Sequence, residues 1–298
     1  MALTLTPVQY GKPRARIAAV RRSLPVLPAW AEASATVVAR LDEDDLPQRL
    51  LDALATVGPF EIACMFVYRA RSSPIYVHDT FLTAGDKLGL RNYCASTYVL
   101  NPFYAACQRG LPTGAYRMRD LAPEGYARSD LAQTYKAVVA NDEEIGYLTL
   151  GWPAGMEELC LALRLPDGEC GEISLSRRTA AGGFSKDDAA AFGAVARFIA
   201  TAFGRHWLRV RTRHLAATRE TGADAAFDRF GGTLLSPRER EIAQLLLRGH
   251  SSASISAQLG ISGTTVKTHR KNLYAKLGIA TQYELFSLFL RSLKEGPA

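Results

Sequence analysis

Ser236-Pro237-Arg238-Glu239 begins the stretch that decides the fold of the C-terminal part of this chain. A proline is tolerated at the first position of a helix, where its missing N–H costs nothing. The serine before it and the glutamate three residues later can each satisfy a free backbone N–H of the opening turn. Gly249 follows the apolar residues of this segment and is typical of a helix C-terminus. The pattern therefore predicts a capped helix that ends near Gly249.

Three more short helices are predicted from the same kinds of signal. Ser251 begins a second helix that ends at Gly260, a third extends over 264–277, and Thr281-Gln282-Tyr283-Glu284 is a capping box that begins a fourth. Two short helices joined by a tight glycine turn, the second of them basic, are typical of a helix-turn-helix DNA-binding domain. We expect an all-α four-helix domain over residues 234–298.

The third predicted helix has two unlike faces. Val266, Leu273 and Leu277 fall on one apolar stripe, which we expect to face the core. The opposite side carries hydroxyl and amine side chains: Thr264, Lys267, Thr268 and Lys271. Lysine can bond the acceptors of a guanine edge, and threonine can contact a thymine methyl group or a phosphate. An ordinary solvated face is the alternative interpretation, but the capped helix before it and the local basic charge favour a DNA contact.

Separate motifs of this region follow one another at a specific spacing: Leu235-Ser236-Pro237-Arg238-Glu239-Arg240-Glu241, Leu259-Gly260-Ile261-Ser262, Thr265-Val266-Lys267-Thr268-His269 and Lys276-Leu277-Gly278. Together they resemble the LuxR/NarL/FixJ-type DNA-binding domain over roughly the last fifth of the chain. The resemblance implies a DNA-binding transcriptional regulator whose recognition helix begins at Thr264.

The resemblance also implies individual contacts. Lys267, Thr268 and Lys271 stand where family members touch bases, and Thr265 stands where they touch a phosphate. Arg270 lies near the apolar stripe, so we expect its stem to lie on the core and its guanidinium to reach a phosphate. The family's second helix commonly reads Ser-Asn-Lys-Glu-Ile-Ala, whereas this chain has Ser-Ser-Ala-Ser-Ile-Ser at 251–256. The lysine that contacts a phosphate in the family is therefore missing here.

The composition is consistent with a DNA-binding domain at the C-terminal end of a longer chain. A chain of 298 residues is long enough for two domains. From residue 205 onward it carries fifteen Lys and Arg against seven Asp and Glu, so the net charge of +7 belongs to the C-terminal third. A phosphate-binding module attached to a nearly neutral domain has this charge distribution.

Several classes of site are not expected. The five cysteines have no metal-ligand spacing and favour buried thiols in a reducing cytoplasm, so we expect no metal and no other cofactor. No apolar run is long enough to span a membrane. Residues 1–30 are basic and interrupted by prolines, which indicates a flexible arm and argues against a signal peptide.

Residues 31–215 have the pattern of one mixed domain. Strand formers occur at 60–69 and 74–79, and helical patterns follow at 86–98, 102–108 and 129–140. Three more predicted strands follow at 145–152, 158–165 and 169–177, the last two joined as a hairpin through Pro166-Asp167-Gly168. A long helix begins at Ser185. The order of elements, and the motif at 182–188 before the last helix, resemble GAF/PAS-like sensor domains with an antiparallel sheet flanked by helices. The fold class is therefore α+β, and residues 216–233 are the expected linker.

An aromatic cluster with one amide is the candidate effector site. Its members are Tyr93, Tyr98, Asn101, Phe103 and Tyr104, with Trp152 on an adjoining strand. Mostly apolar walls with a few polar groups are typical of small-molecule sites, although plain helix-to-sheet packing would use the same residues. Acyl-homoserine-lactone receptors have a tryptophan, a tyrosine and Asp-Pro in a comparable segment. Here Asn101-Pro102 stands instead, and a neutral amide accepts a hydrogen bond more weakly than a carboxylate. We therefore favour a different small metabolite.

We expect a homodimer on an inverted-repeat operator in double-stranded DNA. The apolar stripe of the helix from Ser185 is one candidate contact, and Leu285, Leu288 and Phe289 of the fourth C-terminal helix are another. RNA polymerase is a further candidate partner. Two alternatives are a quorum-sensing receptor for an acyl-homoserine lactone and a constitutive dimer whose N-terminal domain binds a protein. An enzyme is not expected, because His78-Asp79 and the cysteines form no catalytic motif.

Overall fold

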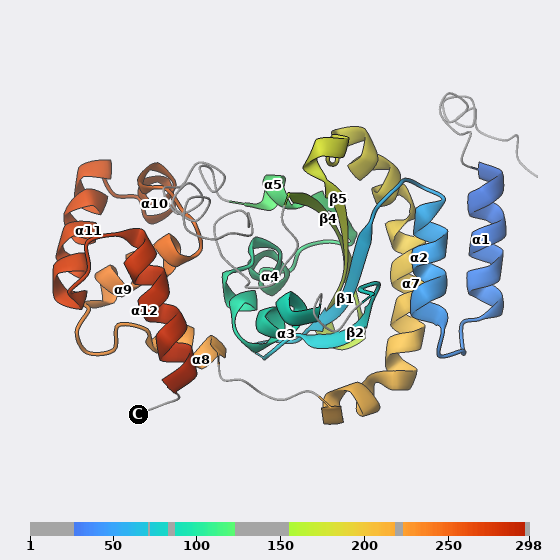
Figure 1. The fold of residues 1–298 in the computed structure, drawn as a ribbon, viewed down its shortest axis with the longest axis horizontal. Helices are drawn as coiled ribbons and strands as arrows, with labels where there is room; N and C mark the ends of the chain where they lie inside the picture. The colour runs from blue at the N-terminus through green and yellow to red at the C-terminus, as the bar shows by residue number, and fades with distance from the viewer. Residues whose placement is uncertain (1–26, 71, 83–86, 123–154, 218–222, 296–298) are drawn as a thin grey trace, which may run out of the picture.

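The computed structural model describes residues 27–70, 72–82, 87–122, 155–217 and 223–295. Figure 1 shows a sheet with helices on both faces at one end of the molecule and a group of short helices at the other. The expected α+β fold with a C-terminal all-α domain is confirmed. In the described ranges, no helix combines the length and the apolar character that a membrane crossing requires.

The sheet contains five described strands in the order β2-β1-β5-β4-β3, and every neighbouring pair is antiparallel. The strands are β1 Ile62–Tyr68, β2 Ile75–Asp79, β3 Gly114–Arg117, β4 Met156–Arg164 and β5 Cys170–Arg178. The predicted hairpin is confirmed, since β4 pairs with β5 across Pro166–Gly168, where Asp167 has a φ of 66°. The expected helix at 129–140 and strand at 145–152 lie outside the described residues.

One face of the sheet is covered by two helices, with a third outside them. Because successive strand residues point to opposite sides, Ala63, Met65 and Val67 of β1 face α2 (Leu46–Ala55) and α7 (Lys186–Ala217). Helix α1 (Leu27–Ala39) lies outside α2 (Figure 1). Since α1 begins at residue 27, the last residues of the expected flexible arm belong to this helix.

The apolar stripe of α7 is used within the domain. Its large side chains are fully buried in the cluster that faces the sheet: Phe192, Ile199, Phe203 and Trp207. The prediction that this stripe forms a dimer contact is therefore wrong, because the sheet already covers it. Burying such side chains contributes about 1.5–3 kcal/mol each to folding, so the stripe stabilises the domain itself.

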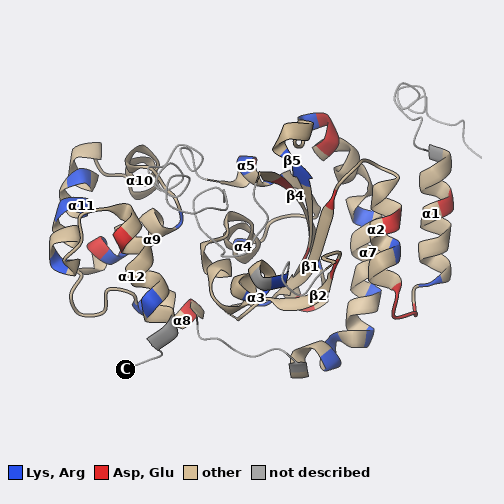
Figure 2. Ribbon diagram, viewed as in Figure 1, with Lys and Arg blue, Asp and Glu red and all other residues tan. Residues whose placement is uncertain are grey.

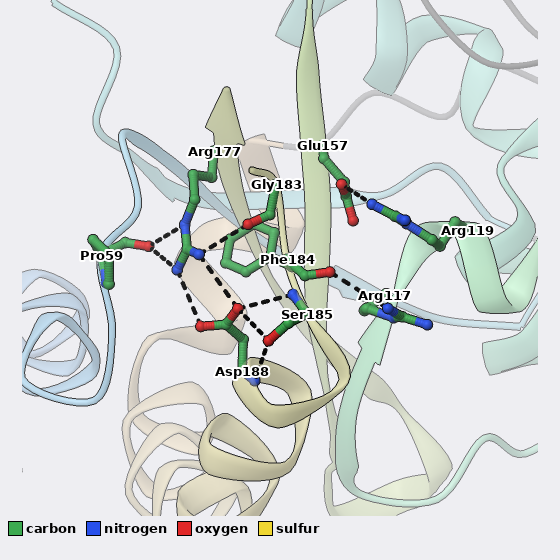
Figure 3. A network of polar contacts seen from close by, with 9 residues as sticks. All are labelled: Pro59, Arg117, Arg119, Glu157, Arg177, Gly183, Phe184, Ser185 and Asp188. Carbon is green, nitrogen blue, oxygen red and sulfur yellow. Dashed lines mark hydrogen bonds and ion pairs between the residues drawn. The ribbon is translucent and has the colours of Figure 1, made fainter. Parts of the chain in front are cut away.

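The turn before α7 is held by one arginine of β5 (Figure 3). Arg177 donates two hydrogen bonds to the carbonyl of Pro59, at 2.8 and 2.6 Å, and one to the carbonyl of Gly183 at 2.9 Å. Asp188 accepts hydrogen bonds from the backbone N–H and the hydroxyl of Ser185, both at 2.8 Å, which caps the helix. The expected turn at 182–188 is thus confirmed as the start of α7.

Short helices cover the other face of the sheet. They are α3 Lys87–Ala95, the 3₁₀ turn η2 Thr97–Leu100, α4 Pro102–Gln108 and α5 Met118–Leu121. Figure 1 shows α3 and α4 on the side of the sheet opposite α7. Asn101 begins α4, because its side-chain oxygen accepts a hydrogen bond from the backbone N–H of Phe103 at 2.8 Å. The aromatic cluster of the sequence therefore lies between helices and sheet.

Four helices form the C-terminal domain, as predicted. They are α9 Pro237–Leu247, α10 Ser252–Leu259, α11 Gly263–Leu277 and α12 Gln282–Glu295. The capping box of Ser236 and Glu239 is present at α9, and Ser251 caps α10. Gly260 ends α10 in the left-handed conformation, with a φ of 62°. Local signals therefore place these helix ends correctly.

The expected linker contains a helix that changes the dimer prediction. Helix α8 (Ala223–Arg229) lies inside the 216–233 segment, and Phe227 is 2% exposed. The ring centroids of Phe227 and Phe230 lie 5.5 and 5.4 Å from that of Phe289 on α12. Leu285 and Phe289 are 0% exposed and Leu288 is partly buried. The prediction that these three residues offer an exposed dimer contact is wrong, because α8 and the other helices cover them.

Candidate functional sites

Helix α11 exposes one polar, basic face. Figure 2 shows its Lys and Arg residues at the end of the molecule farthest from the sheet. The exposed residues of this face are Thr264, Thr265, Lys267, Thr268 and Lys271. On the opposite side, Val266 and Leu273 are 0% exposed. The predicted separation into a core face and a solvent face is confirmed, and nothing within the described domain covers the basic face.

The start of α11 is fixed by hydroxyl groups. The Ser262 Oγ accepts a hydrogen bond from the backbone N–H of Thr265 at 3.0 Å and lies 2.7 Å from the Thr265 Oγ1. The Thr268 hydroxyl donates to the carbonyl of Thr264 at 3.1 Å. These hydroxyls are held by the helix, whereas the long Lys267 and Lys271 side chains extend from it. The lysines are therefore the groups of this face that reach farthest.

Arg270 connects α11 to α10. Its Nη1 donates to the Ser252 Oγ at 2.9 Å, and its guanidinium carbon lies 5.8 Å from the centroid of the Tyr274 ring. The side chain is half-buried. Its guanidinium is bonded to a serine of α10, the helix in which the lysine expected from the family resemblance is missing. Arg270 therefore fixes the relative position of the two helices.

An ion pair links α11 to α9. The Lys276 Nζ lies 2.6 Å from the Oε2 of Glu239, the same glutamate that closes the capping box with Ser236. The hydrogen bond from Lys276 holds the pKa of Glu239 at about 2. One carboxylate thus caps α9 and anchors the end of α11, which makes the angle of α11 depend on it.

A chain of buried hydrogen bonds extends through the sheet domain. The Asn101 Nδ2 donates to the Tyr93 hydroxyl at 2.9 Å, and that hydroxyl lies 2.6 Å from the Tyr68 hydroxyl. Tyr68 in turn donates to the carboxyl group of Glu172 on β5. Asn101 is 4% exposed and Glu172 is 1% exposed. The polar groups of the predicted cluster therefore meet a buried acid.

Sequence reasoning missed Glu172. Burial raises the pKa of its carboxyl group to about 8, and the Tyr68 hydrogen bond opposes that rise. A second acid, Glu158, accepts a hydrogen bond from the Ser174 Oγ at 2.9 Å, and burial raises its pKa as well. The available signal was the parity of β5, in which Glu172 and Ser174 alternate with the apolar Ile173 and Leu175. A period of two in a strand places an acid at 172 on the face opposite to Ile173 and Leu175, which is the face that α3 and α4 cover.

The predicted effector residues separate into two groups. Tyr93, Asn101 and Phe103 lie beside the buried chain, and the Phe103 ring centroid is 6.2 Å from that of Tyr68. The hydroxyls of Tyr98 and Tyr104 instead donate to the carboxylate of Asp224 on α8, at 2.6 and 2.7 Å, and thus connect the two domains. Trp152 lies outside the described residues.

Known proteins resemble the chain in both domains. The model described as "Bacterial regulatory proteins, luxR family" matches residues 233–289. A protein of Aeromonas salmonicida, named as an HTH-type transcriptional regulator in the exeN 3′ region, is 31% identical over 204 residues, which are 66% of this chain and 96% of that protein. The transcriptional regulatory protein MctR of Rhizobium johnstonii is 51% identical over 51 residues, 17% of this chain and 24% of MctR. Among solved structures, the VqsR LBD domain from Pseudomonas aeruginosa aligns with a TM-score of 0.43 and 18% identity, over 60% of this chain and 96% of that one.

Proposed function

The chain belongs to the luxR family of bacterial regulatory proteins and is a DNA-binding transcriptional regulator, and from this we propose that it binds an inverted-repeat operator as a homodimer under the control of a small-molecule effector. The observation that carries the DNA-binding part is the exposed face of α11, where Lys267 and Lys271 stand opposite the buried Val266 and Leu273. A helix of this kind fits the major groove.

Each side chain of α11 has a proposed role. Lys267, Thr268 and Lys271 contact base edges, and Thr264 and Thr265 contact phosphate or sugar near the start of the helix. Arg270 contributes its charge to the backbone contact while its hydrogen bond to Ser252 keeps α10 and α11 in register. The proposed location is the cytoplasm, where bacterial chromosomal DNA lies. If the protein activates transcription, we expect it to contact RNA polymerase.

The homodimer has a direct test in the operator. A two-fold protein places its two recognition helices in successive major grooves, about one helical turn apart. Selection from a random duplex pool with the full chain should enrich an inverted repeat whose half-sites are about 10 base pairs apart. Enrichment of single half-sites only, with a monomer in light scattering, would rule the dimer out.

The effector site proposed here lies between the sheet and the helices α3 and α4. Burial favours the neutral form of Glu172, so at pH 7 its carboxyl group can both donate and accept a hydrogen bond. Asn101 already uses its oxygen to cap α4 and its amide nitrogen to bond Tyr93. These contacts favour a small metabolite with a neutral polar group over an acyl-homoserine lactone that would need a carboxylate at position 101.

The contacts of Asp224 supply a route from effector to DNA. Tyr98 and Tyr104 flank Asn101 in sequence, and both bond Asp224 of the helix that precedes the DNA-binding domain. An effector that shifts η2 or α4 would therefore change the freedom of the helical domain, which alters an existing equilibrium without new DNA contacts. A constitutive dimer with a protein partner remains the alternative function.

Thermal shifts of the full chain test the effector site. A panel of neutral metabolites and acyl-homoserine lactones should contain compounds that raise the melting temperature, and Glu172→Gln should change the response while the surface variant Glu61→Gln does not. No shift from the whole panel would contradict effector control. Catalysis is not part of the proposal. Burial raises the pKa of the Cys94 thiol to about 12, which disfavours a thiolate nucleophile at that position.

A further inference from the structure

A cavity of about 310 Å³ lies between the two domains. The sheet domain contributes Leu100, Pro102 and Leu121 to its walls, and the helical domain contributes Leu245. These residues come from η2, α4 and α5 on one side and from α9 on the other. A volume of this size lies at the lower end of the range typical of small-molecule sites. The apolar residues make one side of the cavity suitable for a hydrocarbon group.

The remaining wall of the cavity is basic. Arg109 follows α4 and Arg248 follows α9, so each domain contributes one guanidinium. His250 and Gln258 complete the polar part, and no described residue that lines the cavity is acidic. Burial lowers the pKa of His250 to about 4, so this ring is neutral near pH 7. The positive charge of the cavity therefore comes from the two arginines.

Arg248 lacks a complete set of partners. Its Nε is buried and has no hydrogen-bond acceptor among the described residues. Its guanidinium carbon lies 4.5 Å from the centroid of the Phe227 ring, which stabilises the cation but satisfies no N–H. Burial lowers the pKa of Arg248, and the charge of Asp224 acts in the opposite direction. The oxygens of Asp224, however, accept hydrogen bonds from the hydroxyls of Tyr98 and Tyr104. A buried donor without an acceptor is costly, and an added anion would supply one.

We propose that this cavity binds a small organic anion, with a carboxylate held between Arg109 and Arg248 and an apolar body against Leu100, Leu121 and Leu245. The planar guanidinium matches the geometry of a carboxylate and can bond it through two N–H groups. Because the two arginines belong to different domains, the bound anion holds the helical domain against the sheet domain. The site is separate from the proposed effector site, since Glu172 does not line it.

Calorimetric titration of the full chain tests this site with sodium hexanoate as the probe and neutral hexanamide as its isostere. Hexanoate should bind one site per chain, and hexanamide should bind at least about tenfold more weakly because it lacks the charge. Arg109→Gln should weaken hexanoate binding by at least about tenfold. Arg109 is exposed, so this variant keeps the fold. Arg248→Lys keeps the charge but loses the planar pair of N–H donors, so it should weaken hexanoate binding by a smaller factor than Arg109→Gln does.

A matched control separates a site from general charge. Arg197→Gln removes an exposed arginine of α7 and should leave hexanoate binding unchanged. Equal binding of hexanoate and hexanamide, or equal loss in Arg197→Gln and Arg109→Gln, would overturn the proposal, as would the absence of saturable binding. Glu172→Gln should leave hexanoate binding intact, which distinguishes failure of this site from failure of the effector site.

Discussion

Single residues of the two proposed sites lie in opposite environments. Lys267 and Lys271 are exposed to water on α11, where they can exchange solvent for phosphate and base contacts. Glu172 is 1% exposed, and its burial favours the neutral acid. In the proposed roles, the side chains of the DNA face would act through charge, and those of the effector site would act through directed hydrogen bonds.

Lys267 and Arg270 should separate recognition from stability. Lys267→Ala should leave the melting temperature unchanged and reduce discrimination at one operator position by about 1–3 kcal/mol. Arg270→Ala removes the bond to Ser252, worth about 1 kcal/mol, and should lower the melting temperature by about 4–8 °C. Calorimetry and competition binding on operator variants measure both effects. Identical behaviour of the two variants would contradict the assignment of faces on α11.

The pH dependence of the unfolding free energy should reveal the raised pKa of Glu172. Its pKa in the folded chain is about 8, above the usual 4.5. Between these two pH values the carboxyl group is therefore protonated in the folded state and ionised in the unfolded state. This group therefore contributes less to stability as pH rises from about 5 to 8. Glu172→Gln should flatten that part of the profile of unfolding free energy. An unchanged slope in the variant would show that the carboxyl group titrates normally.

Secondary structure was predictable from the sequence where its signals are local. Ser236 with Glu239, Ser251 and Gly260 mark helix ends because caps involve residues only a few positions apart. Short elements such as β3, with four residues, and α8, with seven, escaped prediction because tertiary contacts stabilise them, and the longer helix α1 escaped it too. The error at Phe289 followed from α8, because a helix that is not predicted leaves its partner apparently exposed.

Glu239 makes the C-terminal helices sensitive to acid. The hydrogen bond from Lys276 keeps the pKa of Glu239 at about 2, below its usual 4.5, so this group stabilises the fold above about pH 5 and the contribution is lost as pH falls toward 2. Glu239→Gln keeps an oxygen that can accept from Ser236 but removes the charge that bonds Lys276. Losing this charged hydrogen bond at a partly exposed pair costs about 1 kcal/mol, so the variant should lower the melting temperature at pH 7 by several degrees. A stability difference between the two proteins that stays the same from pH 7 to pH 2 would contradict this role.

The whole molecule is two domains connected through α8. One side chain of that helix, Asp224, receives hydrogen bonds from two tyrosines of the sheet domain. The aromatic cluster was predicted from sequence as one effector site, but Tyr98 and Tyr104 point to the other domain. The sequence could not show this, because the contact joins residues more than a hundred positions apart. The fold therefore places neighbouring residues of one sequence motif at two different sites.

Loss of the Asp224 contact should loosen the arrangement of the domains. Asp224→Ala should increase the radius of gyration measured by small-angle X-ray scattering, because two tyrosine hydroxyls lose their acceptor. The double variant Tyr98→Phe with Tyr104→Phe removes only the hydroxyls and should have the same effect. If the scattering of both variants matches that of the natural protein, Asp224 does not hold the domains together.

Affinity for the selected operator tests the central claim most directly, namely that the exposed face of α11 binds DNA. The double variant Lys267→Ala with Lys271→Ala should lose at least about tenfold in affinity, while Lys186→Ala, which removes an exposed lysine of α7, should bind as the natural protein does. An operator affinity that is unchanged in the double variant, with its fold intact by circular dichroism, would contradict the claim.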